Sequence, residues 1–375
     1  MTIGIICEYN PFHNGHIYHI KKIKELYPDS TIILVMSGNF TQRGELSILN
    51  KWDKTKIALN HNIDLIVELP FKYATQSADL FAAGSINILK NLNVDMLIFG
   101  SESNDIELLT SLAQIQLNNS KFDGLVKEYL DNGLNYPTAL NKALNKLTNV
   151  NIYEPNDLLA ISYIKEIIKQ KANIEPISIQ RTNDYHSTNL NVISSASSIR
   201  LALKNNQDVS KSIPEDCLSY LSKPLFLDDY FDLIKYKIIA DDLSNIQGMD
   251  EGIDNRLKKY IYNAYSLEEL IQNVKTKRYT YNRIKRLLVH ILVNYTKEDN
   301  QKDYNYIRVL GFNNKGKKYL NRIKKDIKIP LITNYSNSNG LLNLDYKINS
   351  ILYTKYPKDR QQELLKEEKQ QLIIN

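Results

Sequence analysis

The stretch EYNPFHNGH, residues 8–16, follows directly on the apolar run TIGIIC, residues 2–7, and this junction decides the fold. The apolar run predicts a buried strand. The segment HIYHIKKIKELY, residues 16–27, places isoleucines at helical spacing and is stopped by Pro28. The sequence therefore opens with a strand, a polar turn and a helix.

The turn holds two histidines, His13 and His16, on either side of Gly15. Glycine lets a backbone approach a ligand closely, and the N-terminus of a helix attracts an anion. We therefore interpret the turn as a phosphate site in which imidazoles take the place of a lysine. Two alternatives stay open: the histidines could only cap the helix, or bind zinc, although no third and fourth ligands are spaced nearby.

The first 205 residues alternate strand and helix patterns. Strands are expected over 2–7, 31–37, 64–69, 96–100 and 174–181. Helices are expected over 16–27, 51–61 and 77–92, between the fourth strand and about residue 170, and from 197 to 204. Such alternation predicts a doubly wound parallel sheet of the α/β class, with ligands at the carboxyl ends of its strands. Polar stretches follow these strands, namely EYNPFHNGH, SGNFTQRGE, LPFKYATQSAD, FGSES and QRTNDYHS.

Length and composition limit the alternatives. With 375 residues, 43% hydrophobic and 24% charged, the chain is long enough for two domains, and its net charge of +6 permits a polyanionic partner. Strand patterns fade after about residue 206, so we expect a catalytic domain over 1–205 and a mainly helical domain over 206–375. Cys7 and Cys217 form no metal pattern. Without a membrane-length apolar run or a signal peptide, we expect a cytoplasmic location and no membrane.

A basic cluster in the second half is the candidate surface for nucleic acid. It is free of Asp and Glu, has Tyr279 and Tyr281 interleaved, and consists of Lys275, Lys277, Arg278, Arg283, Lys285 and Arg286. Lysine and arginine contact phosphates, and tyrosines can stack on splayed bases. The alternative is a solvated helix face, and the apolar stripe that continues the cluster means that only part of it can face RNA.

Two further motifs carry a family resemblance. The turn is similar to the H-x-G-H motif of the nucleotidylyl transferase superfamily, and SASSIR, residues 195–200, resembles its second phosphate motif. The motifs GIICEYNPFHNGHIYHI, SGNFTQRGE, LPFKYATQSA, FGSES, EPNDLLAISYIKE and SSASSIR, in this order, resemble the bacterial tRNA-Met cytidine acetate ligases over nearly the whole chain. RYTYNRIKRLL and RVLGFNNKGKKYL resemble the same family.

This resemblance implies an activity in two steps. Members of the family activate acetate with ATP to acetyl-adenylate, and then transfer the acetyl group to the exocyclic amine of the wobble cytidine of elongator tRNA-Met. They do not use acetyl-CoA. We expect ATP as a substrate, Mg²⁺ accompanying it, no metal held by the protein alone and no obligate protein partner.

The resemblance also implies a set of site residues. His13, His16 and Arg181 would stabilise the transition state. The expected ATP-binding residues are Ile6, Cys7, Glu8, Tyr9, Asn10, Pro11, Phe12, His13, Asn14, Gly15, His16, Ile17, Tyr18, His19, Gly100, Asn156, Arg181, Ser198 and Arg200. On pattern alone, Asn156 could instead be a helix cap, Gly100 a turn glycine and Arg181 a surface residue.

The segment after the second strand is the expected acetate site. Ser37, Gln42 and Arg43 would lie beside the α-phosphate, and a small carboxylate needs a cation to hold it. The alternative is a structural ion pair of Arg43 with Glu45 or Asp53. Cys7 is expected to be a core residue and no acyl carrier.

Two rival functions remain at this point. One is an adenylyltransferase that joins AMP to a small phosphorylated metabolite, which would need no tRNA. The other is a non-catalytic protein that binds RNA or nucleotides on the same fold, against which the intact H-x-G-H motif argues.

Overall fold

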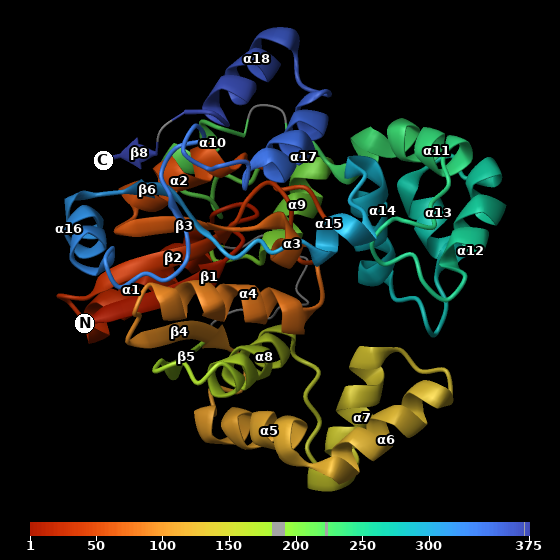
Figure 1. Cartoon of the computed structure of the whole chain (residues 1–375), viewed down its shortest axis with the longest axis horizontal. Helices are drawn as coiled ribbons and strands as arrows, with labels where there is room; N and C mark the ends of the chain where they lie inside the picture. The colour runs from red at the N-terminus through yellow and green to blue at the C-terminus, as the bar shows by residue number, and fades with distance from the viewer. Residues whose placement is uncertain (182–191, 222–223, 371) are drawn as a thin grey trace.

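The computed structural model describes residues 1–181, 192–221, 224–370 and 372–375. Its strands form one sheet in the order β5-β4-β1-β2-β3-β6-β7, and β8 pairs with β6 (Figure 1). The strands are β1 (Thr2–Cys7), β2 (Thr31–Ser37), β3 (Leu65–Leu69), β4 (Met96–Ser101), β5 (Glu175–Gln180), β6 (Ile307–Phe312), β7 (Leu331–Ile332) and β8 (Ile373–Ile374).

Strands β1 to β5 run parallel, and the chain reverses its direction of progress across the sheet beside β1, which lies between β2 and β4. This is a doubly wound arrangement, in which the crevice at the carboxyl ends of the strands is the usual ligand site. The predicted fold class and all five predicted strands are confirmed.

Helices cover both faces of the sheet, and for this reason the central strands read as continuous apolar runs. Ile33, Val35 and Leu65 point to the face that is covered by α4, α5 and α8. Ile3 and Ile5 belong to the opposite core, which is covered by α1, α2 and α9. The two layers fix the strand ends from which the polar loops emerge.

The helices occur in the order expected for the first half, with additional short ones. They are α1 (Asn14–Leu26), α2 (Lys51–Asn60), α3 (Phe71–Ala74), α4 (Ala78–Asn91), α5 (Ile106–Asn118), α6 (Ser120–Asp131), α7 (Tyr136–Thr148), α8 (Pro155–Lys169), α9 (Ala196–Lys204), α10 (Glu215–Leu218), α11 (Phe231–Ala240), α12 (Ile253–Tyr260), α13 (Leu267–Val274), α14 (Tyr281–Val293), α15 (Lys297–Gln301), α16 (Asn314–Ile323), α17 (Asn343–Tyr353) and α18 (Lys358–Glu367).

The second half does not stay apart from the sheet, which corrects one expectation. Strand patterns were expected to fade after residue 206, but β6, β7 and β8 come from that part of the chain and extend the sheet next to β3. Strand β6 runs antiparallel to β3 and pairs Arg308 with Glu68. The second half is mainly helical as predicted, and its part from β6 onward extends the sheet of the first half.

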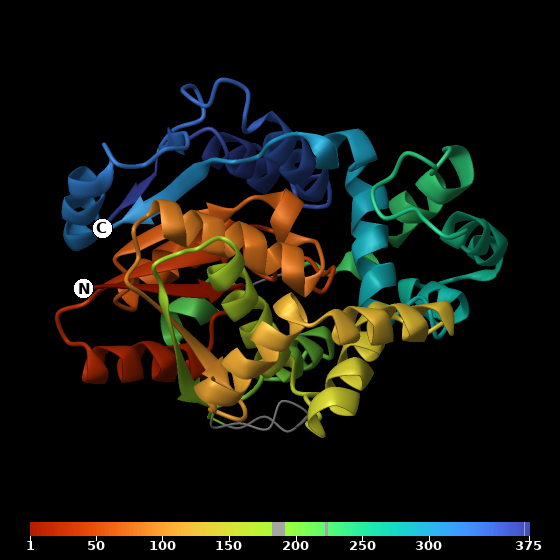
Figure 2. The same cartoon turned by 60° about the horizontal axis from the view of Figure 1, so that its bottom comes forward.

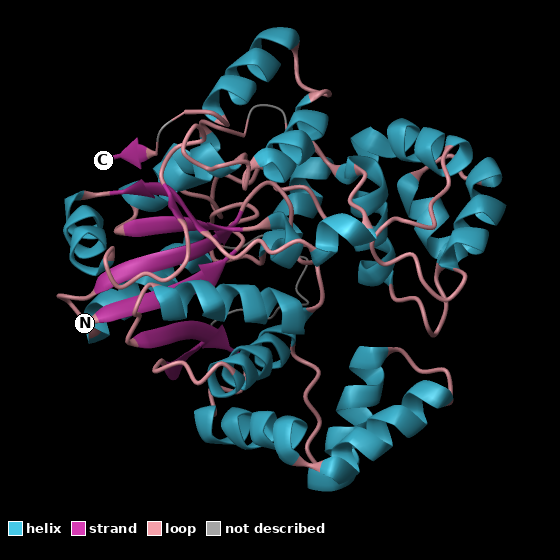
Figure 3. Ribbon diagram, in the orientation of Figure 1, coloured by secondary structure: helices cyan, strands magenta, loops and turns pink. Residues whose placement is uncertain are grey.

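Helices α11 to α14 pack around a second core, which α17 and α18 also join, and Ile234, Leu270 and Leu288 are fully buried in it. The arrowheads of the parallel strands point toward this helical part (Figure 3). Helix α16 lies at the other side of the sheet, by the amino ends of the parallel strands (Figure 1). No helix among the described residues is both long and apolar enough to cross a membrane.

Candidate active site

A cavity of about 630 Å³ lies at the carboxyl ends of the parallel strands. It is lined by the ends of β1, β4 and β5, by the first residues of α1, α8 and α9, and by residues of α4, α7 and α14. Elements from both halves of the chain therefore enclose it. The location is the one that the polar stretches after the strands predicted.

The rings of His13 and His16 close the start of α1 by accepting hydrogen bonds from backbone N–H groups. Nδ1 of His13 accepts from the N–H of Gly15 at 3.0 Å, and Nδ1 of His16 accepts from the N–H of His13 at 3.1 Å. The Nδ1 atoms therefore cap the helix, as the capping alternative predicts. Because each Nδ1 is an acceptor, each neutral ring carries its proton on Nε2, where it is a donor.

The environment keeps both rings neutral. Burial, together with Arg181 and Arg200, lowers the pKa of His13 to about 3, and burial and His13 hold the pKa of His16 well below its usual range. The two ring centroids are 3.8 Å apart. The pair therefore presents two neutral N–H donors at the N-terminus of a helix, which is a suitable environment for a phosphate group.

Glycine is required at position 15 for a structural reason, in addition to the expected approach of the backbone to a ligand. A Cβ at this position would lie 2.8 Å from Cε1 of the His13 ring and 2.9 Å from its Nδ1. Contacts this short do not occur, so a side chain here would displace the ring. The glycine of the H-x-G-H motif is what allows His13 to fold back onto its own helix.

A second corner of the cavity is formed by the ends of β4 and β5 and the start of α8. Glu102 accepts from the side-chain amide of Asn156 and, at 3.1 Å, from the N–H of Asp157. In return, Asp157 accepts from the N–H groups of Glu102 and Ser103 at 3.0 Å each. The carboxylates thus fasten the loop after β4 to the helix that carries Asn156.

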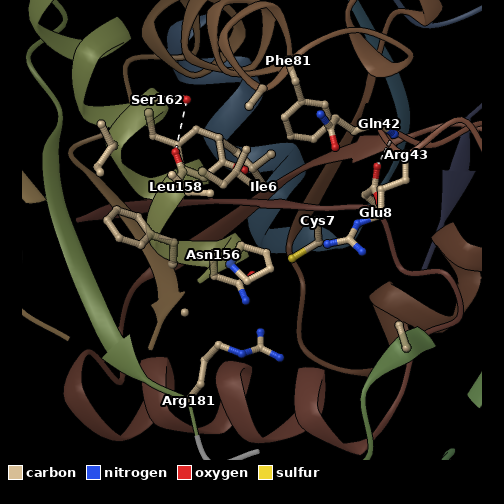
Figure 4. A pocket seen from close by; sticks show the side chains of 18 of the residues that line it. Ile6, Cys7, Glu8, Gln42, Arg43, Phe81, Asn156, Leu158, Ser162 and Arg181 are labelled. Atoms are coloured by element: carbon tan, nitrogen blue, oxygen red, sulfur yellow. Dashed lines mark hydrogen bonds between the residues drawn. The ribbon is translucent and has the colours of Figure 1, made fainter. Parts of the chain in front are cut away.

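Arg181 follows β5 and extends into this corner. Its Nε lies 3.7 Å from Oε1 of Glu102, beyond hydrogen-bond distance, and this buried Nε has no acceptor among the described residues. Figure 4 shows its guanidinium and the Asn156 amide in the same space, with Phe81 and Gln42 on the opposite side. Gly100 lines the same corner. The three residues expected here are therefore brought together.

The expected acetate segment is only partly in the cavity. Gln42 and Arg43 line it, whereas Ser37 is buried outside the lining residues. The N–H of Gln42 donates to Oε1 of Glu8 at 2.7 Å. Lys54 fixes the base of this loop by donating to the carbonyls of Glu8, Ser37 and Gly38 at 2.7 to 2.9 Å.

The second phosphate motif forms the start of α9. Ser195 caps the helix by accepting from the N–H of Ser198 at 3.1 Å, and Ser198 turns its hydroxyl toward Ser195 instead of lining the cavity. Arg200 lines the cavity, donating to the carbonyl of Asn10 at 2.8 Å and pairing with Glu45 at 2.8 Å.

Some of the remaining residues expected to bind ATP line the cavity, and others do not. Residues 6–19 line the cavity with the exception of Pro11, Phe12, Asn14 and Ile17. Phe12 is instead part of the core beside α1. A helix and a turn cannot present every side chain to one side, and this geometry accounts for the exceptions.

The basic cluster is divided between two environments. Arg286 lines the cavity and donates to the carbonyl of Gln42 at 3.2 Å, while Lys285 pairs with Glu45 at 2.5 Å. Arg283 pairs with Glu251 at 3.0 Å. The exposed members are Lys275, Lys277 and Arg278.

Glu102 was not expected in the site, and Glu45 was considered only as a partner of Arg43. Glu102 and Glu45 stand within the motifs FGSES and SGNFTQRGE, but the pattern gave no sign that they would hold Asn156 or Arg200. Within the described part of the chain, no group of three or more His, Cys, Asp or Glu residues could hold a metal ion.

Comparisons with known proteins agree with this geometry. The model of the HIGH Nucleotidyl Transferase family matches residues 1–368. A tRNA(Met) cytidine acetate ligase of Caldicellulosiruptor bescii is 42% identical over 360 residues, which is 92% of this chain and 89% of that protein.

Two solved structures of TmcAL from Thermotoga maritima have the same fold. The apo form is 31% identical with a TM-score of 0.92, and the form bound with alpha-thio ATP is 30% identical with a TM-score of 0.91. Each covers 100% of this chain and 99% of its own. The chain therefore belongs to the HIGH nucleotidyl transferase family and, within it, to the tRNA(Met) cytidine acetate ligases.

Proposed function

We propose that this enzyme activates acetate with ATP and transfers the acetyl group to the exocyclic amine of the wobble cytidine of elongator tRNA-Met, giving N4-acetylcytidine. The observation that carries the proposal is the convergence, in one cavity, of two neutral imidazole donors, Arg181 and the start of α9. The names of the relatives and the ATP analogue held by one solved structure support it.

In the first step an acetate oxygen attacks the α-phosphorus of ATP. A bond forms between that oxygen and phosphorus, the bond from the α-phosphorus to the bridging oxygen breaks, and pyrophosphate leaves. The Nε2–H groups of His13 and His16 and the guanidinium of Arg181 are the donors placed to stabilise the negative charge that builds up. Mg²⁺ that accompanies ATP would neutralise part of the phosphate charge.

In the second step the cytidine amine attacks the acetyl carbonyl. The new C–N bond replaces the C–O bond to AMP, AMP leaves, and the amine gives up one proton. Direct transfer needs no protein nucleophile. Burial raises the pKa of Cys7 to about 12, so the only cysteine that lines the cavity among the described residues stays a thiol at neutral pH.

Acetate is proposed to bind beside Gln42 and Arg43. The two side chains line the cavity, and the loop that carries them is fixed by Glu8 and Lys54. Replacement of Arg43 by Ala is expected to raise the Michaelis constant for acetate while the one for ATP changes little. An unchanged acetate constant would remove Arg43 from this role.

The function is tested by incubating the protein with ATP, labelled acetate and bulk tRNA. Label is expected in the RNA as N4-acetylcytidine, with AMP and pyrophosphate as co-products. A parallel reaction with labelled acetyl-CoA and no acetate should leave the RNA unlabelled.

The rival functions give different results in the same assay. An adenylyltransferase acting on a phosphorylated metabolite would form a stable adenylated product without tRNA, and a binding protein would turn over no ATP. Either result would overturn the proposal. A tRNA acceptor also agrees with the cytoplasmic location that we expect.

A further inference from the structure

Exposed lining residues of the cavity come from two elements that are far apart in the sequence. Tyr136 and Pro137, at the start of α7, and Thr280 and Asn282, at the start of α14, all line the cavity. We call these four residues the α7–α14 rim. None of them was singled out as a site residue in the sequence.

The two sides of the rim are tied together directly. The side-chain amide of Asn135, which caps α7, donates to the carbonyl of Lys277 at 3.0 Å. Figure 2 shows the yellow helices of residues 120–148 beside the teal helices that include α14. The rim is therefore one continuous structure, although its halves come from the two parts of the chain.

The rim carries an exposed aromatic ring on its α7 side, and exposed cations precede its α14 side. Tyr136 is 45% exposed although it lines the cavity. Lys277 and Arg278 are exposed in the turn that leads into α14. A half-exposed ring on one side of the rim, with cations that can contact phosphates in the turn on the other side, matches a nucleotide splayed out of a single strand of RNA.

The rim is also distinct from the phosphate end of the cavity. The donors for the triphosphate come from α1, α9 and the end of β5, whereas the rim comes from α7 and α14. An acceptor base that enters over the rim would share the cavity with the activated acetate without competing for His13, His16 or Arg181.

We propose that the α7–α14 rim is the seat of the acceptor cytidine, with the base stacked on Tyr136, the Asn282 amide at the base edge and the strand phosphates on Lys277 and Arg278. This inference rests on the proposed function and deepens it. Other exposed tyrosines, such as Tyr262 and Tyr265, do not line the cavity and could contact RNA only at a distance from the reaction.

The experiment compares Tyr136→Ala, Tyr136→Phe and Tyr220→Ala in the full-length enzyme. Tyr220 is the matched control, because it is 39% exposed and does not line the cavity. Two rates are measured for each protein: acetate-dependent ATP–pyrophosphate exchange without tRNA, and transfer of labelled acetate to tRNA.

Tyr136→Ala is expected to lower kcat/KM for tRNA about tenfold or more, because one stacked base is lost, while exchange continues at the wild-type rate. Tyr136→Phe keeps the ring and should restore transfer, and Tyr220→Ala should behave as wild type in both assays. Wild-type transfer in Tyr136→Ala would overturn the inference. An equal loss of exchange and transfer would also overturn it, because the ring would then serve ATP.

The proposed function and this inference fail in different ways. Absence of acetate-dependent exchange in the wild-type enzyme would contradict the proposed function itself. Asn282→Ala provides a second, exposed position with the same expected split: exchange is kept and transfer is reduced. If both rim variants transfer acetate normally while the wild type performs exchange, the acceptor base lies elsewhere.

Discussion

Two buried polar clusters lie near the strand ends of this sheet, and they differ in where their hydrogen bonds point. In the closed cluster, Lys51 pairs with Glu68 at 3.0 Å and with Glu368 at 2.8 Å, and Arg308 pairs with Glu68 at 3.0 Å. Its charges pair with one another, although Oε2 of Glu368 meets Lys51 and Arg308 only as ion pairs, without a hydrogen bond.

The open cluster consists of His13, His16, His19 and Arg181. Nε2 of His19 and Nε of Arg181 are buried without an acceptor among the described residues, and all four side chains line the cavity. Both clusters contain buried polar atoms, so burial of polar groups does not by itself identify a site. A site is identified by hydrogen-bond donors that have no acceptor in the protein and that face a cavity.

The largest expected effect is on stability and comes from the closed cluster. Lys51→Met leaves the buried carboxylates of Glu68 and Glu368 short of a cation, and we expect a loss of about 3–5 kcal/mol in the free energy of unfolding. Urea denaturation measures this loss. Lys22→Met, which breaks the exposed pair of Lys22 with Glu25, is the control and should cost less than about 1 kcal/mol. Equal losses would contradict the distinction between the clusters.

The second expected effect is a loss of stability in mild acid. Burial lowers the pKa of His13 to about 3, of His19 to about 4 and of His290 to about 4. The unfolded chain binds these protons below about pH 6.5, whereas the folded chain does so only near pH 3 to 4. Stability is therefore fully present above pH 6.5.

As the pH falls through that window, stability should decrease by about 1.4 kcal/mol per pH unit for each histidine. Urea denaturation from pH 7 to pH 5 measures the slope. A flat profile would contradict this prediction, because it would show that the folded and unfolded chains bind the same number of protons over this range.

The third effect separates a guanidinium from an ammonium in the open cluster. Arg181→Lys keeps the charge but loses the planar group, and we expect about a tenfold lower kcat/KM for ATP in the exchange reaction. Arg322→Lys, on exposed α16, is the matched control. If the two variants have the same rate as wild type, Arg181 acts only as a distant charge.

The smallest effect concerns the exposed cations. Lys277→Ala should reduce the slope of log K against log salt for tRNA binding by about 0.7 to 0.9, which is the value for one phosphate contact. Lys318→Ala, exposed on α16 at the far side of the sheet, should leave the slope unchanged. A change for Lys318 alone would place the RNA on the other side of the molecule.

The sequence predicts the elements that depend on local patterns and misses those that depend on contacts between distant residues. Strands β1 to β5 were predicted because each is a local apolar run between helices, and the polar stretches after them were predicted because the ends of parallel strands meet. Strand β6 was missed, since its place beside β3 depends on the pairing of Arg308 with Glu68, 240 positions away in the chain.

The candidate site was predictable to the same extent. His13, His16, Gly100 and Arg181 stand in motifs that the sequence displays, and the cavity brings them together. The direction of a side chain is decided by packing, so Ser198 was expected in the lining and instead faces Ser195. Arg286 was expected on an RNA surface because it belongs to the basic cluster, but packing directs its side chain into the lining of the cavity.

The central claim is that His13 donates from Nε2 to the reacting phosphate while its Nδ1 only caps the helix. His13→Asn separates the two, because asparagine is a good N-cap but has no donor at that distance from the backbone. The measurement is acetate-dependent ATP–pyrophosphate exchange without tRNA. We predict a kcat about 10²–10³ lower than wild type, with the free energy of unfolding changed by less than about 1 kcal/mol. Exchange at the wild-type rate in this stable variant would contradict the account.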